Sequence, residues 1–381
     1  MNILVLGSGM MGQAITYDLF KNSNFDKITI SDFNKSNLDS AKKFLNTEKI
    51  YFKEINVKNL IDIKKIFVEN DIVISAIPYQ YNFDMTKIAI LTKTHFLDLG
   101  GNNKIVNKQK KLSKKAKIKK ISIIPDCGLA PGIVSTITRD IVNELNNIKF
   151  VKIRVGGLPI KPKPPLNYQI VFSPNGLINE YVEDSIILYN AKIIKKKSMT
   201  EIEKIFFPKP FGEMEAFLTS GGCSTLPYTY REKIGYLDYK TIRYPGHCEK
   251  FKILVDIILG DEKPIEINNI DLKPREFLIE SLKKNLPINK KDVVLLKIDS
   301  EGEIKGKKMS LTYTLIDYFN EKENLTAMMR TTGFPISIIA QMIERKIISK
   351  RGVYCPEEIV PCEQFFLELA KRGINIIKEF N

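Results

Sequence analysis

The stretch MNILVLGSGMMG (Met1–Gly12) decides the fold of the N-terminal part of this chain. Its apolar run Asn2–Leu6 is typical of a strand that is buried on both faces. Three glycines follow with the spacing GxGxxG, and an amphipathic stretch from Gln13 to Lys21 comes next. Such glycines are a weak signal alone, but between a strand and a helix they indicate a dinucleotide-binding turn.

Each glycine of this turn has a separate expected role. Gly7 permits the tight turn, Gly9 lets the backbone approach a pyrophosphate, and Gly12 lets helix and strand pack closely. The phosphates then lie on the positive N-terminus of the helix. Met10 and Met11 complete the predicted phosphate-binding segment.

A second short strand, Lys27–Ser31, ends at Asp32, twenty residues after Gly12. An acid at this place binds the ribose hydroxyls and repels a 2′-phosphate, so NAD is expected in preference to NADP. Lys35 lies nearby and weakens that preference, so NADP stays open. A second interpretation makes Asp32 the N-cap of the helix that begins near Lys35, and the two roles are compatible.

Strand-like and helix-like segments alternate through the rest of the first 130 residues, which predicts a doubly wound parallel sheet of the Rossmann type. A helix is expected from Asn59 to Val68, and the strand-like runs are Ile50–Ile55, Asp71–Ala76, His95–Leu99 and Ile121–Pro125. Ligands bind at the carboxyl ends of such strands. There we expect Asn56 and Val57 beside the adenine, and Ala76 and Pro78 beside the nicotinamide.

Longer motifs span nearly the whole chain: AIPYQYN (76–82), DLGGNN (98–103), DCGLAPG (126–132), GGLPIKPKPPLNYQIVFS (156–173), TSGGCSTLP (219–227) and KTIRYPGHCEKF (240–251). This set resembles the saccharopine dehydrogenase family, and within it most closely the L-lysine 6-dehydrogenases. The resemblance implies an α/β fold in three segments: a Rossmann domain (1–130), an inserted mixed α/β domain for substrate and dimerisation (131–325), and a C-terminal segment (326–381) that returns to the Rossmann domain.

The segments after residue 130 fit this division. Apolar residues at helical spacing from Ile133 to Val142 predict a helix that bridges the domains. A long helix is expected from Glu323 to Glu344. Between these two helices lie the predicted strands IKFVKIRV, NYQIVF, SIILYNAKII, DVVLLKIDS and KKMSLTYTLID.

The resemblance implies an NAD(P)-dependent oxidoreductase that acts on a C–N bond of an amino acid. The leading hypothesis is oxidative deamination of the lysine 6-amine to the semialdehyde, which cyclises to piperideine-6-carboxylate. Saccharopine dehydrogenase and carboxynorspermidine dehydrogenase or synthase activities are alternatives of the same class. A non-enzymatic regulatory protein that binds NAD(P) is an alternative of another class, and the substrate-domain motifs argue against it.

This chemistry needs a group that accepts a proton, because the free lysine amine has a pKa of about 10.4. Asp126, which follows a predicted strand, is the first catalytic candidate, with a role in capping or turn formation as an equal alternative. His247 is the second candidate and ranks above His95. Arg243 is the expected anchor of the substrate carboxylate, with a salt bridge between strands as its alternative.

Other candidates lie in the same motifs. Tyr168 and Lys163 flank a proline-rich loop that either closes over substrate or forms a rigid surface, and Thr225 is a further substrate-binding candidate. For the substrate ammonium, either Glu213 or Glu215 is a candidate, unless both face solvent. Cys127 and Cys223 are interpreted as small buried thiols rather than nucleophiles.

Composition argues against several classes of protein. The formal net charge is +15, but the lysine-rich stretch 110–117 lacks interleaved aromatics, so we expect solvated faces and no nucleic acid. Five cysteines without a CxxC pair indicate reduced thiols, a cytoplasmic location and no metal site. No signal peptide or membrane span is expected. A small amino-acid substrate and further copies of the chain are the expected partners.

Overall fold

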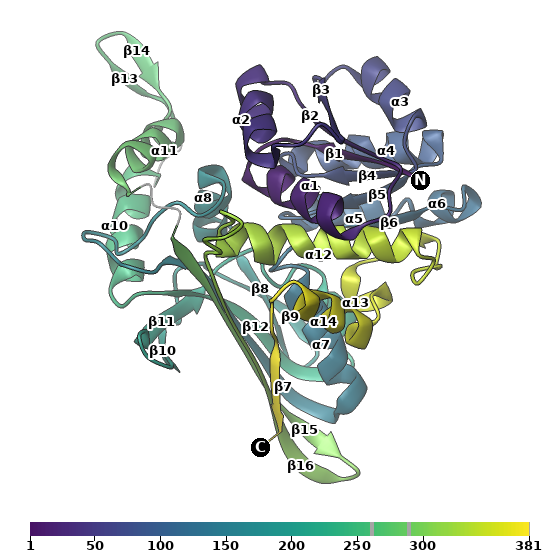
Figure 1. Cartoon of the computed structure of the whole chain (residues 1–381). Helices are drawn as coiled ribbons and strands as arrows, with labels where there is room; N and C mark the ends of the chain where they lie inside the picture. The colour runs from purple at the N-terminus through teal and green to yellow at the C-terminus, as the bar shows by residue number, and fades with distance from the viewer. Residues whose placement is uncertain (260–262, 288–290, 381) are drawn as a thin grey trace. The chain divides into compact units, whose positions relative to one another are not determined.

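The computed structural model describes residues 1–259, 263–287 and 291–380, and the chain divides into two compact units (Figure 1). The first unit contains Met1–Glu144, Ser224–Leu226 and Met329–Ile376. The second contains Leu145–Cys223, Pro227–Met328 and the residues from Ile377 onward. The chain therefore passes between the units five times.

The first unit is built on a parallel sheet of seven strands in the order β17-β6-β5-β4-β1-β2-β3. The reversal of strand order beside β1 is the doubly wound topology that the N-terminal motifs predict. The strands are β1 (Asn2–Leu6), β2 (Lys27–Asp32), β3 (Ile50–Glu54), β4 (Ile72–Ser75), β5 (His95–Asp98), β6 (Ser122–Ile124) and β17 (Gly352–Val353).

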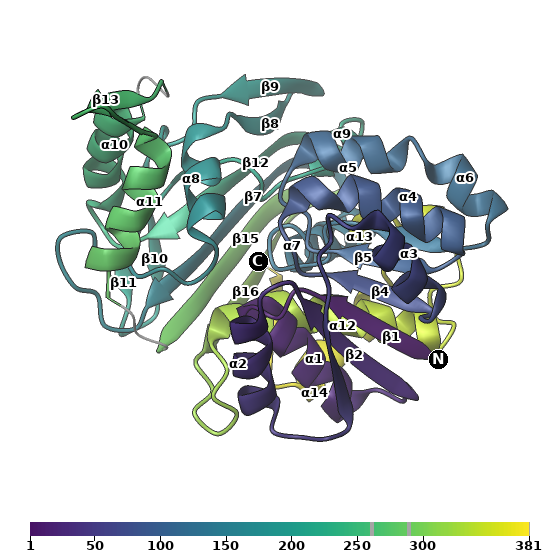
Figure 2. The same ribbon diagram turned by 90° about the horizontal axis from the view of Figure 1, so that it is seen from above.

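Helices cover both faces of this sheet (Figure 2). One face carries α1 (Met10–Asn22), α2 (Lys35–Leu45) and α12 (Ala327–Glu344), and the other carries α3 (Leu60–Val68), α4 (Asn82–Thr92) and α5 (Asn103–Lys110). The remaining short elements of the unit are η1 (Tyr79–Tyr81), α6 (Ser113–Ile118), α7 (Ile133–Glu144), α13 (Pro356–Ile359) and α14 (Cys362–Lys371).

The sequence explains why these elements begin where they do. All side chains of β1 from Ile3 to Leu6 are fully buried, as a central parallel strand requires. Asparagine side chains cap three of the helices by accepting backbone N–H bonds of the first turn, which satisfies donors that the helix itself leaves open. These caps are Asn34 for α2, Asn59 for α3 and Asn102 for α5.

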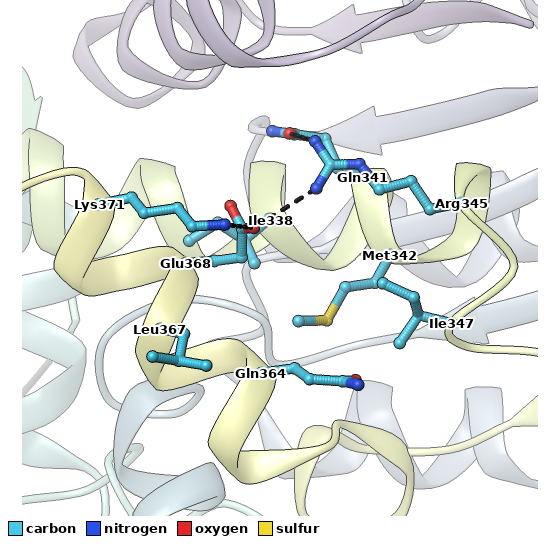
Figure 3. Close-up of a pocket in the computed structure, with 9 residues that line it drawn as sticks. All are labelled: Ile338, Gln341, Met342, Arg345, Ile347, Gln364, Leu367, Glu368 and Lys371. Carbon is cyan, nitrogen blue, oxygen red and sulfur yellow. Dashed lines mark hydrogen bonds and ion pairs between the residues drawn. The ribbon is translucent and has the colours of Figure 1, made fainter.

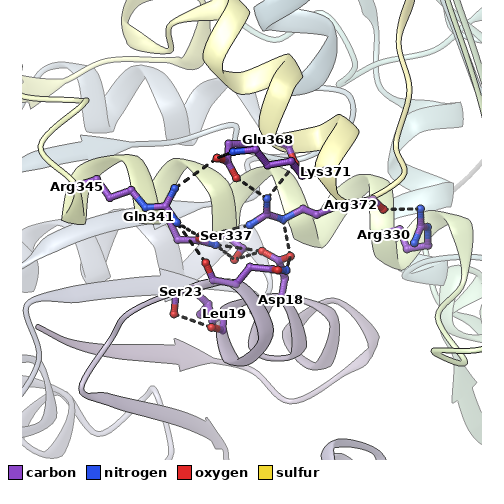
Figure 4. A network of polar contacts seen from close by, with 11 residues as sticks. Asp18, Leu19, Ser23, Arg330, Ser337, Gln341, Arg345, Glu368, Lys371 and Arg372 are labelled. Carbon is purple, nitrogen blue, oxygen red and sulfur yellow. Dashed lines mark hydrogen bonds and ion pairs between the residues drawn. The ribbon is translucent and has the colours of Figure 1, made fainter.

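A buried carboxylate joins α1 to the C-terminal helices of the first unit (Figure 4). Asp18 is fully buried and accepts hydrogen bonds from Ser337 Oγ at 2.6 Å and from Arg372 Nε at 2.6 Å. Arg372 also pairs with Glu368, four residues earlier on α14. Because a buried carboxylate is costly without donors, these bonds favour a single docking position of α12 and α14 on α1.

The second unit contains a mixed sheet with the main strand order β10-β11-β12-β7-β15-β16-β18, to which β8 and β9 are added at β12. Strands β7 and β12 are parallel and the other neighbours are antiparallel. The strands are β7 (Asn146–Pro159), β8 (Ser185–Tyr189), β9 (Lys192–Lys196), β10 (Glu203–Phe207), β11 (Gly212–Leu218), β12 (Ile234–Arg243), β15 (Asp292–Ile304), β16 (Lys307–Tyr318) and β18 (Ile377–Phe380).

Helices and one small hairpin complete the second unit. They are α8 (Pro174–Val182), α10 (His247–Ile258) and α11 (Pro274–Asn285), together with the hairpin β13 (Ile265–Ile267) and β14 (Ile270–Leu272). The short helix α9 (Leu226–Thr229) begins where the chain leaves the first unit. Helix α11 packs against both α8 and α10. Both units together confirm the predicted α/β class, with a parallel Rossmann sheet and a separate mixed sheet.

The boundaries of the units differ from the predicted boundaries at residues 130 and 325. Helix α7 packs against α13 and α14, so the first unit extends to Glu144. The tail does not stay with the first unit, because Ile377–Phe380 pairs with β16 as β18. Ser224–Leu226 also belongs to the first unit, which the sequence analysis did not foresee.

Two predicted elements have different limits. The run NYQIVF contains no strand, and its Tyr168 ring packs on the guanidinium of Arg243. Helix α12 begins at Ala327 rather than Glu323. Its first turn is capped by the carboxylate of Asp292, which accepts the backbone N–H groups of Ala327 and Met328 from a distant part of the sequence.

None of the helices in the described ranges combines the length and hydrophobicity that a membrane span requires. The five cysteines are buried and form no disulfide, as the sequence analysis expected of reduced thiols. The cytoplasmic location itself stays a prediction.

Candidate cofactor and substrate sites

The glycine turn of the first unit has the geometry that a pyrophosphate requires. A Cβ on Gly7 would lie 2.7 Å from the carbonyl oxygen of Ala76, and Gly7 has a φ of +95°. A Cβ on Gly12 would lie 1.8 Å from the carbonyl oxygen of Gly7, so helix and strand approach too closely for any side chain. Gly9 is exposed and a Cβ there would meet nothing within 4 Å. The open space lies where the phosphates are expected.

Asp32 lies at the end of β2 and is bound to the same turn. Its Oδ2 accepts hydrogen bonds from the backbone N–H of Ser8 at 2.9 Å and from Ser8 Oγ at 3.1 Å. Its Oδ1 accepts the backbone N–H of Asn34, but the N-cap of α2 is Asn34 and not Asp32. The structure therefore places the Asp32 carboxylate beside the glycine turn, where an acid that binds the ribose hydroxyls is expected.

The other predicted cofactor residues lie along the carboxyl edge of the same sheet. Asn56 and Val57 follow β3, and Asn56 Oδ1 accepts the backbone N–H of Lys58. The backbone N–H of Ala76 donates to Leu6, which places the end of β4 beside the glycine turn, and Pro78 follows it. Met10 and Met11 open α1, with Met10 exposed.

Gly9 and Gly12 offer a paired test of this site. Gly9→Val is expected to abolish NADH and NADPH binding while the melting temperature stays near that of the wild type, because the new side chain enters only the open space. Gly12→Val is expected to lower the melting temperature as well, because its side chain collides with the Gly7 carbonyl. Fluorescence titration and calorimetry measure the two effects. Unchanged NADH affinity in Gly9→Val would contradict the assignment.

Asp126 lies in a group of buried carboxyls in the first unit. It is 1% exposed, has a φ of +66°, and its Oδ2 accepts a hydrogen bond from Ser224 Oγ. Its Oδ1 is buried and has no hydrogen-bond partner among the described residues. A Cβ on Gly100 would lie 1.9 Å from this oxygen, so Gly100 leaves the room that Asp126 occupies.

Burial raises the pKa of Asp126 well above its ordinary value, and the nearby Asp98 and Glu357 carboxyls raise it further. The hydrogen bond from Ser224 acts in the opposite direction. Burial also raises the pKa of Asp98 to about 6, although Gln109 Nε2 and the backbone N–H of Gly100 both donate to its carboxylate. Asp126 thus has the property that a proton-accepting carboxyl needs and that an exposed aspartate lacks.

The predicted substrate residue Thr225 is also in the first unit. Its hydroxyl donates to Glu357 Oε1 at 2.6 Å. Cys355, Glu357 and Glu358 are close enough together to hold a cation. Glu358, however, accepts from Lys110 Nζ and from the backbone N–H of Cys355, so it is already used by the protein. We therefore assign no metal to this group.

In the second unit, a chain of hydrogen bonds fixes Arg243. His247 Nδ1 donates to the carbonyl oxygen of Leu166 at 2.9 Å, which leaves Nε2 as an acceptor for the hydroxyl of Tyr181 at 3.0 Å. The Tyr181 oxygen in turn accepts Arg243 Nε at 2.9 Å. Arg243 Nη1 donates to the carbonyl oxygen of Ile242.

Aromatic side chains enclose this arginine. Arg243 is 2% exposed, and its guanidinium lies 4.8 Å from the centre of the Tyr168 ring and 5.8 Å from that of Tyr181. Tyr168 is buried and makes an edge contact with the His247 ring. Lys163 is exposed, and its backbone oxygen accepts the N–H of Asn167. The motif residues Tyr168, Arg243 and His247 are therefore brought together, whereas Lys163 stays at the surface.

Both ring nitrogens of His247 have protein partners, and burial together with the charge of Arg243 lowers its pKa to about 3. A neutral imidazole in this state holds Tyr181 and, through it, Arg243. The geometry therefore favours a positioning role for His247 over proton transfer. His95 is likewise used internally, because its Nδ1 accepts the backbone N–H of Ser122.

The two glutamates that were expected near the substrate are already bound by other groups of the protein. Glu215 accepts the backbone N–H groups of Gly246 and Cys248 and so caps the N-terminus of α10. Glu213 is exposed and pairs with Lys204. A different carboxyl, Glu180 on α8, interacts electrostatically with Arg243. Asp98 opens the motif DLGGNN, but the sequence analysis gave it no role, and no motif contained Glu180 or Tyr181, because the environments of these residues arise only in the folded unit.

A shallow pocket in the first unit lies between α12 and α14 (Figure 3). Ile338 and Met342 line it together with polar side chains of both helices. The carboxylate of Glu368 on its wall is bound by Lys371 and Arg345. These charged groups are bound to one another, so the pocket offers no catalytic constellation.

Comparison with known proteins finds one family over most of the chain. The profile of the saccharopine dehydrogenase NADP binding domain matches residues 3–124, and that of the saccharopine dehydrogenase C-terminal domain matches residues 128–374. Saccharopine dehydrogenase (NADP(+), L-glutamate-forming) of Schizosaccharomyces pombe is 24% identical over 387 residues, which cover 82% of this chain and 84% of that protein.

Two solved structures share the fold. Apo saccharopine dehydrogenase (L-Glu forming) from Saccharomyces cerevisiae aligns with a TM-score of 0.81 and 21% identity, over 100% of this chain and 99% of the other. Homospermidine synthase from Legionella pneumophila in complex with NAD aligns with a TM-score of 0.67 and 16% identity, over 100% and 91%. At these identities the structures show a common fold and nothing finer.

Proposed function

Because this chain belongs to the saccharopine dehydrogenase family, we propose that it oxidises the C6–N bond of a lysyl group. Membership confirms the family resemblance seen in the sequence and identifies an NAD(P)-dependent oxidoreductase of amino-acid metabolism. The observation that carries the proposal is Asp126, whose buried carboxyl has a raised pKa and one unpartnered oxygen in the unit that also holds the glycine turn.

Arg243 is the proposed anchor of the α-carboxylate. A buried guanidinium whose Nε and Nη1 are held by the protein presents its remaining N–H groups in a fixed direction. Tyr168 and Tyr181 exclude water around it, which strengthens its attraction for a carboxylate.

Asp126 is the proposed proton acceptor. Oxidation needs the neutral amine, so a carboxylate must take the ammonium proton before the C–H bond breaks. Its partner Ser224 holds Oδ2, and Oδ1 stays open for the proton. When bound at the glycine turn, the nicotinamide supplies the hydride acceptor.

Two substrates are compatible with this chemistry and give the same semialdehyde. The names of the relatives favour saccharopine, whose oxidation and hydrolysis release glutamate. The motifs of the sequence analysis favour lysine, whose 6-amine leaves as ammonia. The leaving group therefore separates the two substrates.

The test is a spectrophotometric screen of NAD and NADP reduction with saccharopine, lysine, ornithine and diaminopimelate, followed by assays of glutamate and ammonia. We expect absorbance at the reduced-cofactor band with saccharopine or lysine. If none of the four amino acids reduces either cofactor, the proposal fails.

Asp32 predicts the cofactor preference within this function. Its carboxylate, fixed by Ser8, is expected to favour NAD over NADP in kcat/KM by repelling a 2′-phosphate. Asp32→Asn keeps an acceptor for Ser8 but removes the charge, and it should reduce that preference by about 10- to 100-fold, the size of a lost charged interaction. Steady-state kinetics with both cofactors measure the ratio. A wild-type preference for NADP would contradict this prediction and implicate Lys35.

A further inference from the structure

We propose that Asp98 is a positioning residue for Asp126, because its carboxylate fixes the glycine against which the Asp126 carboxyl lies. The inference rests on the proposed function, since it takes Asp126 as the proton acceptor. It goes beyond that function by giving a role to the motif DLGGNN (98–103), which the proposed mechanism does not use.

The Asp98 carboxylate lies at the end of β5 and is fully buried. Its Oδ1 accepts the backbone N–H of Gly100 at 2.8 Å, and its Oδ2 accepts Gln109 Nε2 at 2.7 Å. The backbone carbonyl oxygen of Asp98 accepts the N–H of Cys127 at 2.9 Å. Because a buried carboxylate is costly without donors, these bonds favour one arrangement of the loop after β5 and the turn that contains Asp126.

Gly100 is the part of this loop that meets Asp126. A Cβ on Gly100 would lie 1.9 Å from Asp126 Oδ1 and 3.0 Å from Asp126 Cα, so the glycine backbone packs directly on the aspartate. Gly100 also has a φ of +73°, in the left-handed region that other residues rarely adopt. The N–H group that Asp98 binds therefore belongs to the residue that limits where Oδ1 can lie.

The other end of the motif leads to the second oxygen of Asp126. Asn103 Nδ2 donates a long hydrogen bond of 3.4 Å to the carbonyl oxygen of Ser224, and Ser224 Oγ donates to Asp126 Oδ2. The Asp126 carboxyl is thus bounded on both sides by contacts that trace back to one motif, with Gly100 at Oδ1 and Ser224 at Oδ2.

The position of Oδ1 matters because it is the oxygen that remains for the substrate proton. It is buried and has no hydrogen-bond partner within the described part of the chain. A proton acceptor must lie about 2.6–3.2 Å from the donor atom. A misplacement of about 1 Å can cost about 100-fold in rate. Asp98 is therefore expected to act on kcat rather than on KM.

The charge of Asp98 has a second, separable effect on Asp126. It raises the pKa of Asp126, as does Glu357, whereas Lys110 lowers it. Burial raises the pKa of Asp98 itself to about 6, so Asp98 is mostly ionised at neutral pH. A neutral replacement of Asp98 should therefore lower the pKa of Asp126, whether or not Asp126 keeps its position.

Two variants separate position from charge. Asp98→Asn keeps an oxygen for the Gly100 N–H, and Gln109 Oε1, which is buried without a partner among the described residues, can accept from the new amide if the Gln109 side chain flips. It should keep a kcat close to that of the wild type, with the rise of kcat moved to lower pH. Asp98→Ala should move the rise in the same direction but lower kcat by about 10- to 100-fold, with little change in KM.

Asn102→Ala is the matched control within the same motif, because the Asn102 side chain caps α5 by accepting the N–H groups of Lys104 and Ile105. It should lower the melting temperature, as the loss of a cap does, and leave kcat and its pH profile unchanged. Three results of steady-state kinetics across pH would each overturn the inference: a wild-type kcat in Asp98→Ala, an equal loss of kcat in Asp98→Asn, or an equal loss in Asn102→Ala.

A measurement without turnover separates this inference from the proposed reaction. The protonated carboxyl of Asp126 absorbs in the infrared, and its band is identified by its absence in Asp126→Asn. A single position gives a narrow band, which we expect in the wild type and in Asp98→Asn, whereas Asp98→Ala should broaden or shift it.

The two measurements can fail independently. If no amino acid is turned over but the band changes only in Asp98→Ala, the positioning role stands and the reaction is rejected. If lysine or saccharopine is turned over but the band is the same in the wild type and in Asp98→Ala, the reaction stands and the role of Asp98 is rejected.

Discussion

Arg243→Ala is expected to raise KM for the lysyl substrate about 100-fold, because a buried charged hydrogen bond to the α-carboxylate contributes roughly 1.5–3 kcal/mol. The counterpart without this carboxylate, cadaverine in the case of lysine, should keep its kcat/KM nearly unchanged. Steady-state kinetics with the two substrates give the comparison. The effect is expected to be large because the guanidinium is 2% exposed, so water cannot replace it.

Two further variants separate binding from folding. Arg243→Lys keeps a cation beside the Tyr168 ring, but an ammonium group cannot donate the two parallel hydrogen bonds of a guanidinium. It should therefore raise KM, with a smaller loss of stability than Arg243→Ala. Arg231→Ala changes an exposed arginine that pairs only with Glu232 in the ion pairs of the described residues, and it should have no effect. Equal losses for lysine and cadaverine would make Arg243 a structural residue.

Asp126→Asn is expected to lower kcat by about 10²- to 10⁴-fold, the usual contribution of a general base. The basic form of Asp126 is needed, so wild-type kcat should rise as pH increases through its raised pKa. The variant should lose this rise. Its melting temperature should not fall, because the substitution removes a buried charge near Asp98 and Glu357 and asparagine tolerates a φ of +66°.

Ser224→Ala sharpens this test. The hydrogen bond from Ser224 lowers the pKa of Asp126, so its removal should move the rise of kcat to higher pH without abolishing activity. An unchanged kcat and pH profile in Asp126→Asn would mean that Asp126 only shapes the turn. The proton would then need another acceptor, although His247, with both ring nitrogens bonded, is poorly suited.

The glycine turn and the carboxylate beside it were predictable because their signals are local. Gly7, Gly9 and Gly12 act within one turn, and the spacing to Asp32 follows from one strand–helix–strand unit. Asp126 and Arg243 were predictable as candidates from their motifs. Their environments were not, since the pKa of Asp126 depends on Asp98 and Glu357, which lie far apart in the sequence.

The errors arose where distant contacts decide the outcome. The start of α12 is set by Asp292, a cap that no local pattern shows. The run NYQIVF has the composition of a strand, but in the structure it forms none and its Tyr168 ring packs on Arg243, which lies far away in the sequence.

The interleaving of the two units has a consequence for biosynthesis. The first unit begins with Met1, but its edge strand β17 and the helices that bury Asp18 come from residues after Met328. During translation these segments leave the ribosome only after most of the second unit has emerged. Until then, the nascent N-terminal sheet lacks its edge strand β17, and the Asp18 carboxylate lacks its partners. Chaperones bind such incompletely folded states, and unpaired strand edges favour aggregation. The cofactor-binding unit is therefore complete only after residues 329–376 have left the ribosome, and not when the N-terminal sequence has been made.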